Sequence, residues 1–346
     1  MRAVRFLAVL GAFSGTLLAP AEAKGHEGWG IVRDASGRIY VTDIPANTIW
    51  RIDANGNTVP VRRTTHSHAL AVGADGAIYG THVRLTAPIR SVWRLDMAGR
   101  STAFVPETPG LPLDLQPFLL AADGTIYSMS PHEHALPADQ RRLFVVRRSP
   151  AGVIDTVAGG LKGQADGNGR TARFTGVDGM AWLPDGSLLL VDGARLRRLT
   201  RDGTAQSLTP PLTEFQWDQD LMGASVAPDG SVYVADFSGQ RVLRIDGPSV
   251  STVTKTGGYW APTGVLATAD GAYTLEHPRA PLGILGDLGI GPYLRVRLAR
   301  PDGSTQVVTR LWGRNTKYVV AFAAGVVALV IGVRAWRRSR RRARGR

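Results

Sequence analysis

The segment SVAPDGSVYV (Ser225–Val234) contains an apolar run, an Asp-Gly turn and a second run rich in β-branched residues. Related segments occur elsewhere in the chain: IVRDASGRIYV, AVGADGAIYG, LLAADGTIYS, AWLPDGSLLL and VLATADGAYTL. The turn glycines of the whole set are Gly37, Gly76, Gly124, Gly186, Gly230 and Gly271, spaced 39, 48, 62, 44 and 41 residues apart. Two strands around a tight turn, repeated at this period, indicate a ring of small sheets, a β-propeller.

Each repeat continues into two further strand-like runs after the Asp-Gly turn. In the fifth repeat these are RVLRID and SVSTVTK, with alternating polar and apolar residues bounded by turn residues. Four strands in each of six repeats predict an all-β, six-bladed propeller. Every third strand carries an arginine at the same place, which we expect to face solvent and pair with a neighbouring blade: Arg51, Arg94, Arg147, Arg198, Arg244 and Arg297.

Both ends of the chain carry apolar segments. Met1–Ala23 has basic residues, an apolar stretch and an Ala-Glu-Ala site, which is typical of a cleaved signal peptide; an uncleaved anchor is the alternative. Tyr318–Val333 is uncharged, and eight arginines follow between Arg334 and Arg346. This pattern predicts a transmembrane helix. A buried soluble helix and a sorting tail removed at the cell surface are the alternatives.

The boundaries follow from these segments. We expect a signal peptide at 1–23, the propeller at 24–312, a linker at 313–317, a transmembrane helix at 318–336 and an arginine-rich tail at 337–346. Since basic flanks stay in the cytoplasm, the tail should be cytoplasmic and the propeller extracytoplasmic on a single-pass membrane protein.

Composition excludes several classes of function. The net charge of +13 is concentrated at the ends, because residues 24–333 hold 31 basic and 27 acidic residues, a difference of +4. A propeller with so little net charge gives no sign of nucleic-acid binding. The chain has no cysteine, which excludes thiol catalysis, disulfides and cysteine-ligated metals.

All seven histidines fall in segments at one end of the predicted blades. We name the strands of a blade A to D, from the inside outwards. The start of A, the B–C loop and the end of D then lie at one end, which we call the loop rim; the A–B and C–D turns form the turn rim. The histidines of the loop rim are His26, His66, His68, His82, His132, His134 and His277. Long loops on a rigid scaffold are common places for binding sites, although polar residues also gather in loops without a function.

The first residue of each innermost strand should face the central channel. Counting back from the turn glycines gives Trp29, His68, Gln116, Asp178, Met222 and Thr263. Without Met222 and together with Glu27, His82 and His277, these residues form a candidate ligand-binding site at the channel mouth; side chains that merely fill a narrow channel are the alternative.

The repeats resemble NHL-repeat and gluconolactonase-like propellers, the group that includes regucalcin and strictosidine synthase. The similarity is clearest in GGLKGQADGNGRTARFTGVDGMAWLPDGSLLLVDG (Gly159–Gly193) and GWGIVRDASGRIYVTDIPANTIWRID (Gly28–Asp53). It extends over Glu27–Leu311 and is specific for the fold, because this architecture carries many functions.

The resemblance implies a divalent cation, such as calcium, zinc or manganese, at the channel mouth. Glu27 and Asp178 match two of the family's ligands, whereas Met222 stands where the family has a second carboxylate. A thioether is a poor ligand for a hard cation, and His68 or Asp220 would have to replace it.

The sequence leaves more than one function open. The first is an exported, membrane-anchored propeller that binds a small molecule or a protein partner through the loop rim. The second is a metal-dependent hydrolase of lactones or esters, with a loop histidine as general base. A third is a platform for protein partners that uses the turn rim around Gly37 and Gly76.

Overall fold

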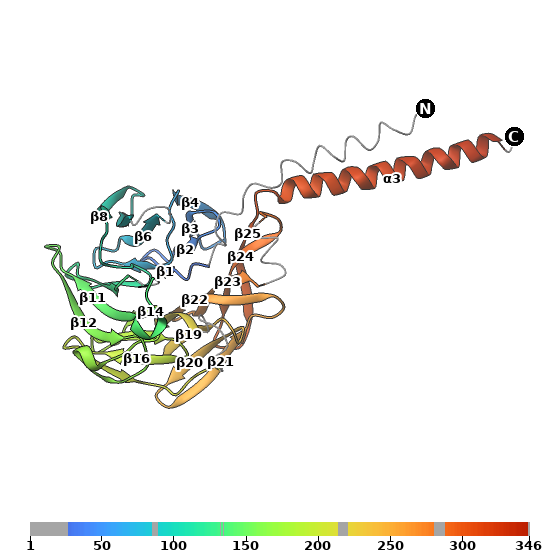
Figure 1. The fold of residues 1–346 in the computed structure, drawn as a ribbon. Helices are drawn as coiled ribbons and strands as arrows, with labels where there is room; N and C mark the ends of the chain where they lie inside the picture. The colour runs from blue at the N-terminus through green and yellow to red at the C-terminus, as the bar shows by residue number, and fades with distance from the viewer. Residues whose placement is uncertain are drawn as a thin grey trace.

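The structure is a computed structural model that describes residues 27–84, 89–131, 133, 135–213, 221–279 and 288–344, with side chains up to 336. The expected signal peptide and His26, His132, His134 and Asp220 lie outside these residues. The described strands form six antiparallel sheets, which surround a common axis as the blades of a propeller (Figure 1). The predicted six-bladed, all-β architecture is therefore confirmed.

Strands follow one another from the inside of each blade to the outside. Blades one and two contain β1 (Ile31–Arg33), β2 (Ile39–Asp43), β3 (Thr48–Ile52), β4 (Thr58–Arg63), β5 (Leu70–Val72), β6 (Ile78–Arg84), β7 (Ile89–Leu95) and β8 (Ser101–Pro109). Blade three contains β9 (Phe118–Leu120), β10 (Ile126–Met129), β11 (Arg142–Arg148) and β12 (Ile154–Leu161).

Blade four contains β14 (Val177–Trp182), β15 (Leu188–Asp192), β16 (Arg195–Leu199) and β17 (Thr204–Ser207), and the short β13 (Gly167–Asn168) pairs with β17 at the outer edge. Blades five and six contain β18 (Leu221–Val226), β19 (Val232–Asp236), β20 (Arg241–Asp246), β21 (Ser249–Lys255), β22 (Trp260–Thr268), β23 (Gly271–Pro278), β24 (Pro292–Ala299) and β25 (Thr305–Trp312). Two 3-10 turns, Ala138–Gln140 and Gly169–Thr171, lie between strands.

The repeated Asp-Gly turn has a clear physical cause. At Gly230 the backbone has φ +85°, a conformation that L side chains rarely adopt, and the Gly230 amide donates to the Ala227 carbonyl at 2.9 Å. Asp229 accepts a hydrogen bond from the Ser231 amide at 3.0 Å. This arrangement reverses the chain within a few residues and sets the register of strands A and B.

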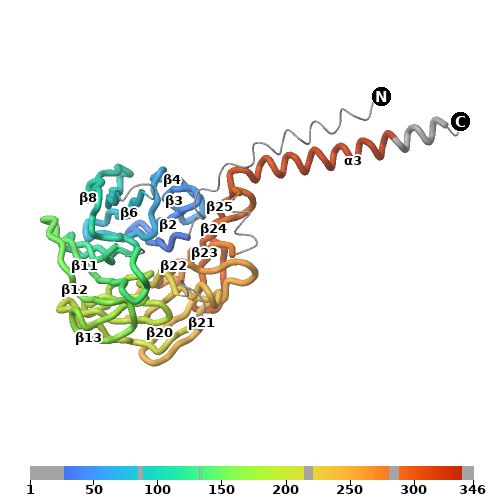
Figure 2. Tube along the Cα trace, in the orientation of Figure 1, coloured from blue at the N-terminus to red at the C-terminus, as the bar shows by residue number. Residues whose placement is uncertain are grey.

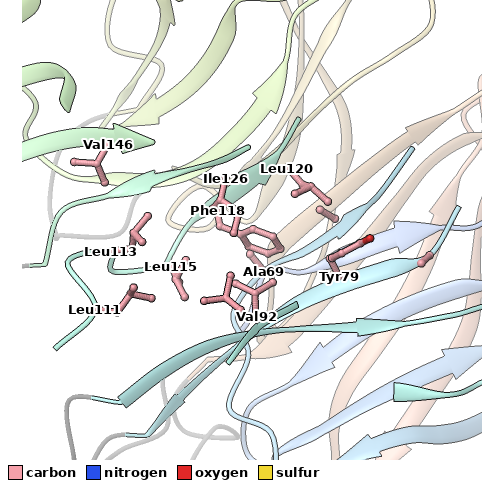
Figure 3. Packing of buried hydrophobic residues seen from close by; sticks show 13 residues of the cluster. Ala69, Tyr79, Val92, Leu111, Leu113, Leu115, Phe118, Leu120, Ile126 and Val146 are labelled. Atoms are coloured by element: carbon pink, nitrogen blue, oxygen red, sulfur yellow. The ribbon is translucent and has the colours of Figure 1, made fainter. Parts of the chain in front are cut away.

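Hydrophobic clusters join neighbouring blades around the whole ring. One cluster joins Ala69, Tyr79 and Val92 of blade two to Phe118 and Ile126 of blade three (Figure 3). Similar clusters lie at the other junctions, including Ile31, Val41 and Ile52 of blade one with Leu275 and Val296 of blade six. The core is therefore distributed among the blade interfaces.

Polar contacts and close backbone packing join the first blade to the last. The Thr263 hydroxyl donates to the Gly28 carbonyl at 2.8 Å, and the Tyr293 hydroxyl donates to the buried Asp43 carboxylate at 2.7 Å. β1 lies against β22 as well as β5, so the innermost strands form a closed circle. The four strands of blade one are consecutive in the sequence, and so are those of blade six, so neither blade borrows a strand from the other. The joint between them therefore depends on side-chain and backbone packing.

Gly264 provides a test of this joint. A Cβ atom at Gly264 would lie 2.2 Å from the Trp29 carbonyl oxygen and 3.2 Å from Ile31 Cγ2, closer than packed atoms allow. We expect Gly264→Ala to destabilise the propeller by about 1–3 kcal/mol or more in urea unfolding. Gly176→Ala is the control, because its added Cβ meets nothing within 4 Å. Equal midpoints for the two variants would contradict the tight joint.

The repeated arginines form ion pairs within their own blades rather than with neighbouring blades as expected, although Arg297 also donates to the Lys255 carbonyl of blade five at 2.9 Å. Most pair with an aspartate of their own blade: Arg94 with Asp75, Arg147 with Asp155, Arg198 with Asp185, and Arg244 with Asp229. Arg297 instead points inward and binds Glu276 of its own blade. The reason is geometric. Strand C lies between strands B and D of its own blade, so its arginine can reach an aspartate of the A–B turn or of strand D.

Helix α3 (Thr316–Arg344) follows β25 directly and extends away from the propeller (Figure 2). It begins inside the segment expected to be a linker, since the Asn315 amide donates to the Gly289 carbonyl at 2.8 Å and the Gly291 amide donates to the Thr316 hydroxyl at 2.9 Å. The B–C loop of blade six therefore holds the start of the helix. Residues Thr316–Trp336 are long and apolar enough to cross a membrane, and their side chains are not buried in the protein.

Candidate site at the channel mouth

Three histidines of the loop rim lie together over blade two. His66 and His68 both precede β5, and their Nε2 atoms are 3.0 Å apart. The His66 amide donates to Nδ1 of His82, at the end of β6, at 3.2 Å. Because one Nε2 must donate and the other must accept, the two facing rings hold a single proton between these nitrogens. We call His66, His68 and His82 the histidine cluster.

Trp29 connects this cluster to the centre of the ring. Its indole lies against His68 with ring centroids 4.9 Å apart, and its amide donates to the His68 carbonyl at 2.9 Å. On another side, a Cβ at Gly223 of blade five would lie 3.3 Å from Trp29 Cβ. The inner strands are therefore packed closely here, and Trp29 contacts residues from both sides of the channel.

Burial divides the predicted mouth residues into two groups. His68, Met222, Thr263 and His277 are almost fully buried. The half-buried residues, which keep some exposure to solvent, are Glu27, Trp29, His82, Gln116 and Asp178. The second group is therefore the part of the predicted site that a ligand can reach.

His277 is a buried, neutral histidine. Its Nδ1 lies 3.1 Å from the Thr263 hydroxyl, which donates to the Gly28 carbonyl, so Nδ1 carries the proton in this contact. Nε2 of His277 has no hydrogen-bond partner among the described residues. Burial lowers the pKa of His277 to about 3, because the imidazolium would lose its hydration. His277 is thus poorly placed to contact a ligand, although the sequence placed it in a loop.

Burial also lowers the pKa of His82. The negative charge of the nearby Glu107 raises this pKa, and the positive charges of Arg62 and Arg84 lower it. His82 is half-buried rather than enclosed. Because Nδ1 of His82 accepts from the His66 amide, the neutral ring carries its proton on Nε2, which can donate to a bound molecule; this makes His82 the histidine of the cluster best suited to contact a ligand.

The described residues do not assemble a metal site. Within the described ranges, no group of three or more His, Asp or Glu side chains is placed to hold a metal ion. Glu27 and Asp178, which the resemblance implies as ligands, are both half-buried, and Met222 is buried at the place of the expected carboxylate. Among the described residues, Glu27 and Asp178 therefore do not make a complete site for the cation that the resemblance implies, and Asp220 lies outside these residues.

Sequence reasoning missed a set of buried acidic residues that end the second strand of several blades. These are Asp43, Asp192, Asp236 and Glu276, all almost fully buried. Asp192, for example, accepts hydrogen bonds from the Thr175 hydroxyl at 2.7 Å and from Arg197 at 2.9 Å. Their shared position just before the B–C loop was a readable signal. Asp43, Asp192 and Asp236 accept hydrogen bonds from backbone amides of the rim, whereas Glu276 binds two arginines of strand C.

Comparison with known proteins identifies solved structures with a similar fold. No protein-family model and no curated protein matches the chain. A streptogramin B lyase structure has TM-score 0.51 and 14% identity over 86% of both chains. A gluconolactonase from Xanthomonas campestris has TM-score 0.52 and 15% identity, covering 72% of this chain and 84% of that one.

A putative gluconolactonase has TM-score 0.51 and 17% identity over 73% of this chain and 87% of that one. At such identities the likeness concerns the fold alone. The chain is a six-bladed β-propeller whose structural neighbours include gluconolactonase-like propellers.

Proposed function

We propose that this chain is an exported, membrane-anchored propeller that binds a small-molecule ligand or a protein partner through its loop rim. The observation that carries the proposal is the gathering of Trp29 and the histidine cluster at the channel mouth, on the rim that also holds the half-buried Glu27, Gln116 and Asp178. Aromatic and polar side chains that remain partly exposed on a rigid scaffold are suited to ligand recognition.

The anchor is helix α3. The segment Thr316–Trp336 has 21 residues, which corresponds to about 31 Å of helix and matches a hydrocarbon core of about 30 Å. Arginines are frequent from Arg334 to the C-terminus, and basic flanks remain in the cytoplasm. The propeller then lies on the extracytoplasmic side, tethered through blade six.

A ligand screen on the full chain tests the binding proposal. We expect a thermal shift with some members of a panel of lactones, sugars and small carboxylic acids. That shift should be lost in Asp178→Ala and weakened in His82→Ala. Ser36→Ala is the control, because Ser36 is exposed in the A–B turn of blade one, on the turn rim. Shifts that persist in Asp178→Ala, or that Ser36→Ala abolishes equally, would refute the loop rim as the binding surface.

The second candidate is a metal-dependent hydrolase of lactones or esters, in which Glu27 and Asp178 hold a cation. It is favoured by the gluconolactonases among the structural neighbours and opposed by the buried Met222. Elemental analysis of the purified full chain separates the two candidates. Stoichiometric calcium, zinc or manganese that is lost in Asp178→Ala, together with lactone hydrolysis, would favour the hydrolase.

A further inference from the structure

A groove of about 1080 Å³ lies on the loop rim between blades four and five. Its lining residues are Gln164, Thr175, Ala194, Arg195, Pro211, Leu212, Thr213 and Arg241. None of them belongs to the channel mouth or the histidine cluster. Clefts that bind small molecules commonly have about 300–1,000 Å³, so this groove has room for a ligand of that size.

Arg195 is the residue that distinguishes the groove. It is the half-buried first residue of β16, and within the described chain its guanidinium makes no hydrogen bond or ion pair. The next arginines of the same strand are paired, Arg197 with Asp192 and Arg198 with Asp185. A half-buried cation that lacks a counter-charge favours the approach of an anion.

Arg241, the first residue of β20, supplies a second guanidinium on the other side of the groove, its charge partly balanced by Asp236. Its Nε donates to the buried Asp236 carboxylate at 2.7 Å, and its Nη2 lies 3.4 Å from the Leu212 carbonyl. Asp236 is itself held by the Gly239 amide at 2.8 Å. These contacts fix the guanidinium plane in advance, so its remaining N–H groups are oriented for a ligand at little further entropic cost.

The other walls of the groove are apolar or neutral. Ala194, Pro211 and Leu212 provide apolar surface, and Gln164 and Thr213 provide neutral polar groups. The Thr175 hydroxyl is engaged by Asp192. No carboxylate is among the described lining residues, and the positive charge of Arg195 is the one on these walls that no described carboxylate compensates.

We propose that this groove binds an anionic ligand that combines a carboxylate or phosphate group with an apolar part, the anion lying between Arg195 and Arg241. A lipid headgroup and a soluble metabolite both offer this chemistry. The soluble source is favoured, because β16, which carries Arg195, lies on the opposite side of the propeller from the start of α3 (Figure 1). The groove is separate from the channel mouth, so this proposal does not depend on the binding proposed there.

The test uses the full chain in phosphatidylcholine nanodiscs, with phenyl phosphate and benzoate as probes and benzyl alcohol as the uncharged comparison. Isothermal titration should show binding of the two anions. Arg195→Ala should weaken that binding about tenfold or more, and Arg195→Lys should weaken it less. Arg84→Ala is the matched control, because it removes an arginine from the same rim over blade two, where Arg84 pairs with Glu107.

Equal affinity of the wild type and Arg195→Ala for phenyl phosphate would overturn the proposal. An equal loss in Arg84→Ala would overturn it too, because the effect would then come from the overall charge of the protein.

Nanodiscs that contain phosphatidylglycerol test whether the ligand is a lipid headgroup or a soluble molecule. If the wild type binds phenyl phosphate more weakly in them than in phosphatidylcholine nanodiscs, the lipid headgroup competes for the groove and the soluble source is overturned; unchanged binding supports the soluble source.

Discussion

Replacing Glu276 with alanine is expected to destabilise the propeller by about 3–5 kcal/mol, as removal of one partner from a buried ion pair does. Glu276 is fully buried at the end of β23, where its carboxylate accepts from Arg295 at 2.5 Å and from Arg297 at 2.9 Å. Both arginines are largely buried on the neighbouring strand β24. The variant leaves two guanidinium groups without their counter-charge inside blade six.

Urea unfolding of the full chain in detergent, followed by tryptophan fluorescence, measures this loss. Asp155→Ala is the matched control, because Asp155 binds Arg147 on the surface, with both side chains more than 40% exposed. An exposed pair contributes at most about 1 kcal/mol. If Glu276→Ala and Asp155→Ala unfolded at the same urea concentration, the buried ion pairs would contribute no more to stability than the exposed pair.

The stability of the propeller should also fall as the solution is acidified, through His277. Burial lowers the pKa of this histidine to about 3 in the folded chain, whereas an unfolded histidine titrates near about 6.5. Between these values the unfolded chain binds a proton that the folded chain does not. Stability from His277 is therefore complete above about pH 6.5 and is lost by about 1.4 kcal/mol per pH unit as the pH falls toward 3.

The comparison of wild type with His277→Gln isolates this effect. Glutamine cannot be protonated in this range, so the difference in unfolding free energy between the two proteins should shrink as the pH falls. Other groups, such as the half-buried His82, have lowered pKa values in both proteins and cancel in the difference. A difference that stays constant from pH 7 to pH 4 would mean that His277 binds a proton as readily in the folded chain as in the unfolded chain, which would contradict the lowered pKa.

The sequence predicted the fold well because the determining signals are local. An Asp-Gly turn such as Asp229-Gly230 requires a positive φ and a short side chain that caps the turn. The glycine provides the first and the adjacent aspartate the second. Repetition of this turn then identifies the blades. The start of α3 was misplaced by two residues because its position depends on contacts of Asn315 and Thr316 with a distant loop.

The candidate site was less predictable because exposure depends on packing between blades. Counting along the repeats placed Trp29 and His68 at the start of neighbouring innermost strands; they precede β1 and β5 by two residues, and the structure brings their rings together. The count carried no information on burial, so it could not separate the enclosed Thr263 and His277 from the accessible Asp178. The groove beside Arg195 joins two blades, which no single repeat reveals.

Single-cysteine labelling in intact cells tests the membrane-anchored propeller most directly, since the chain contains no cysteine of its own. Ala46→Cys places a thiol on the exposed B–C loop of blade one, and Ser339→Cys places one in the basic C-terminal segment. A membrane-impermeant maleimide should label Ala46→Cys in intact cells and label Ser339→Cys only after permeabilisation. Labelling of Ser339→Cys in intact cells, or protection of Ala46→Cys until the membrane is opened, would contradict the account.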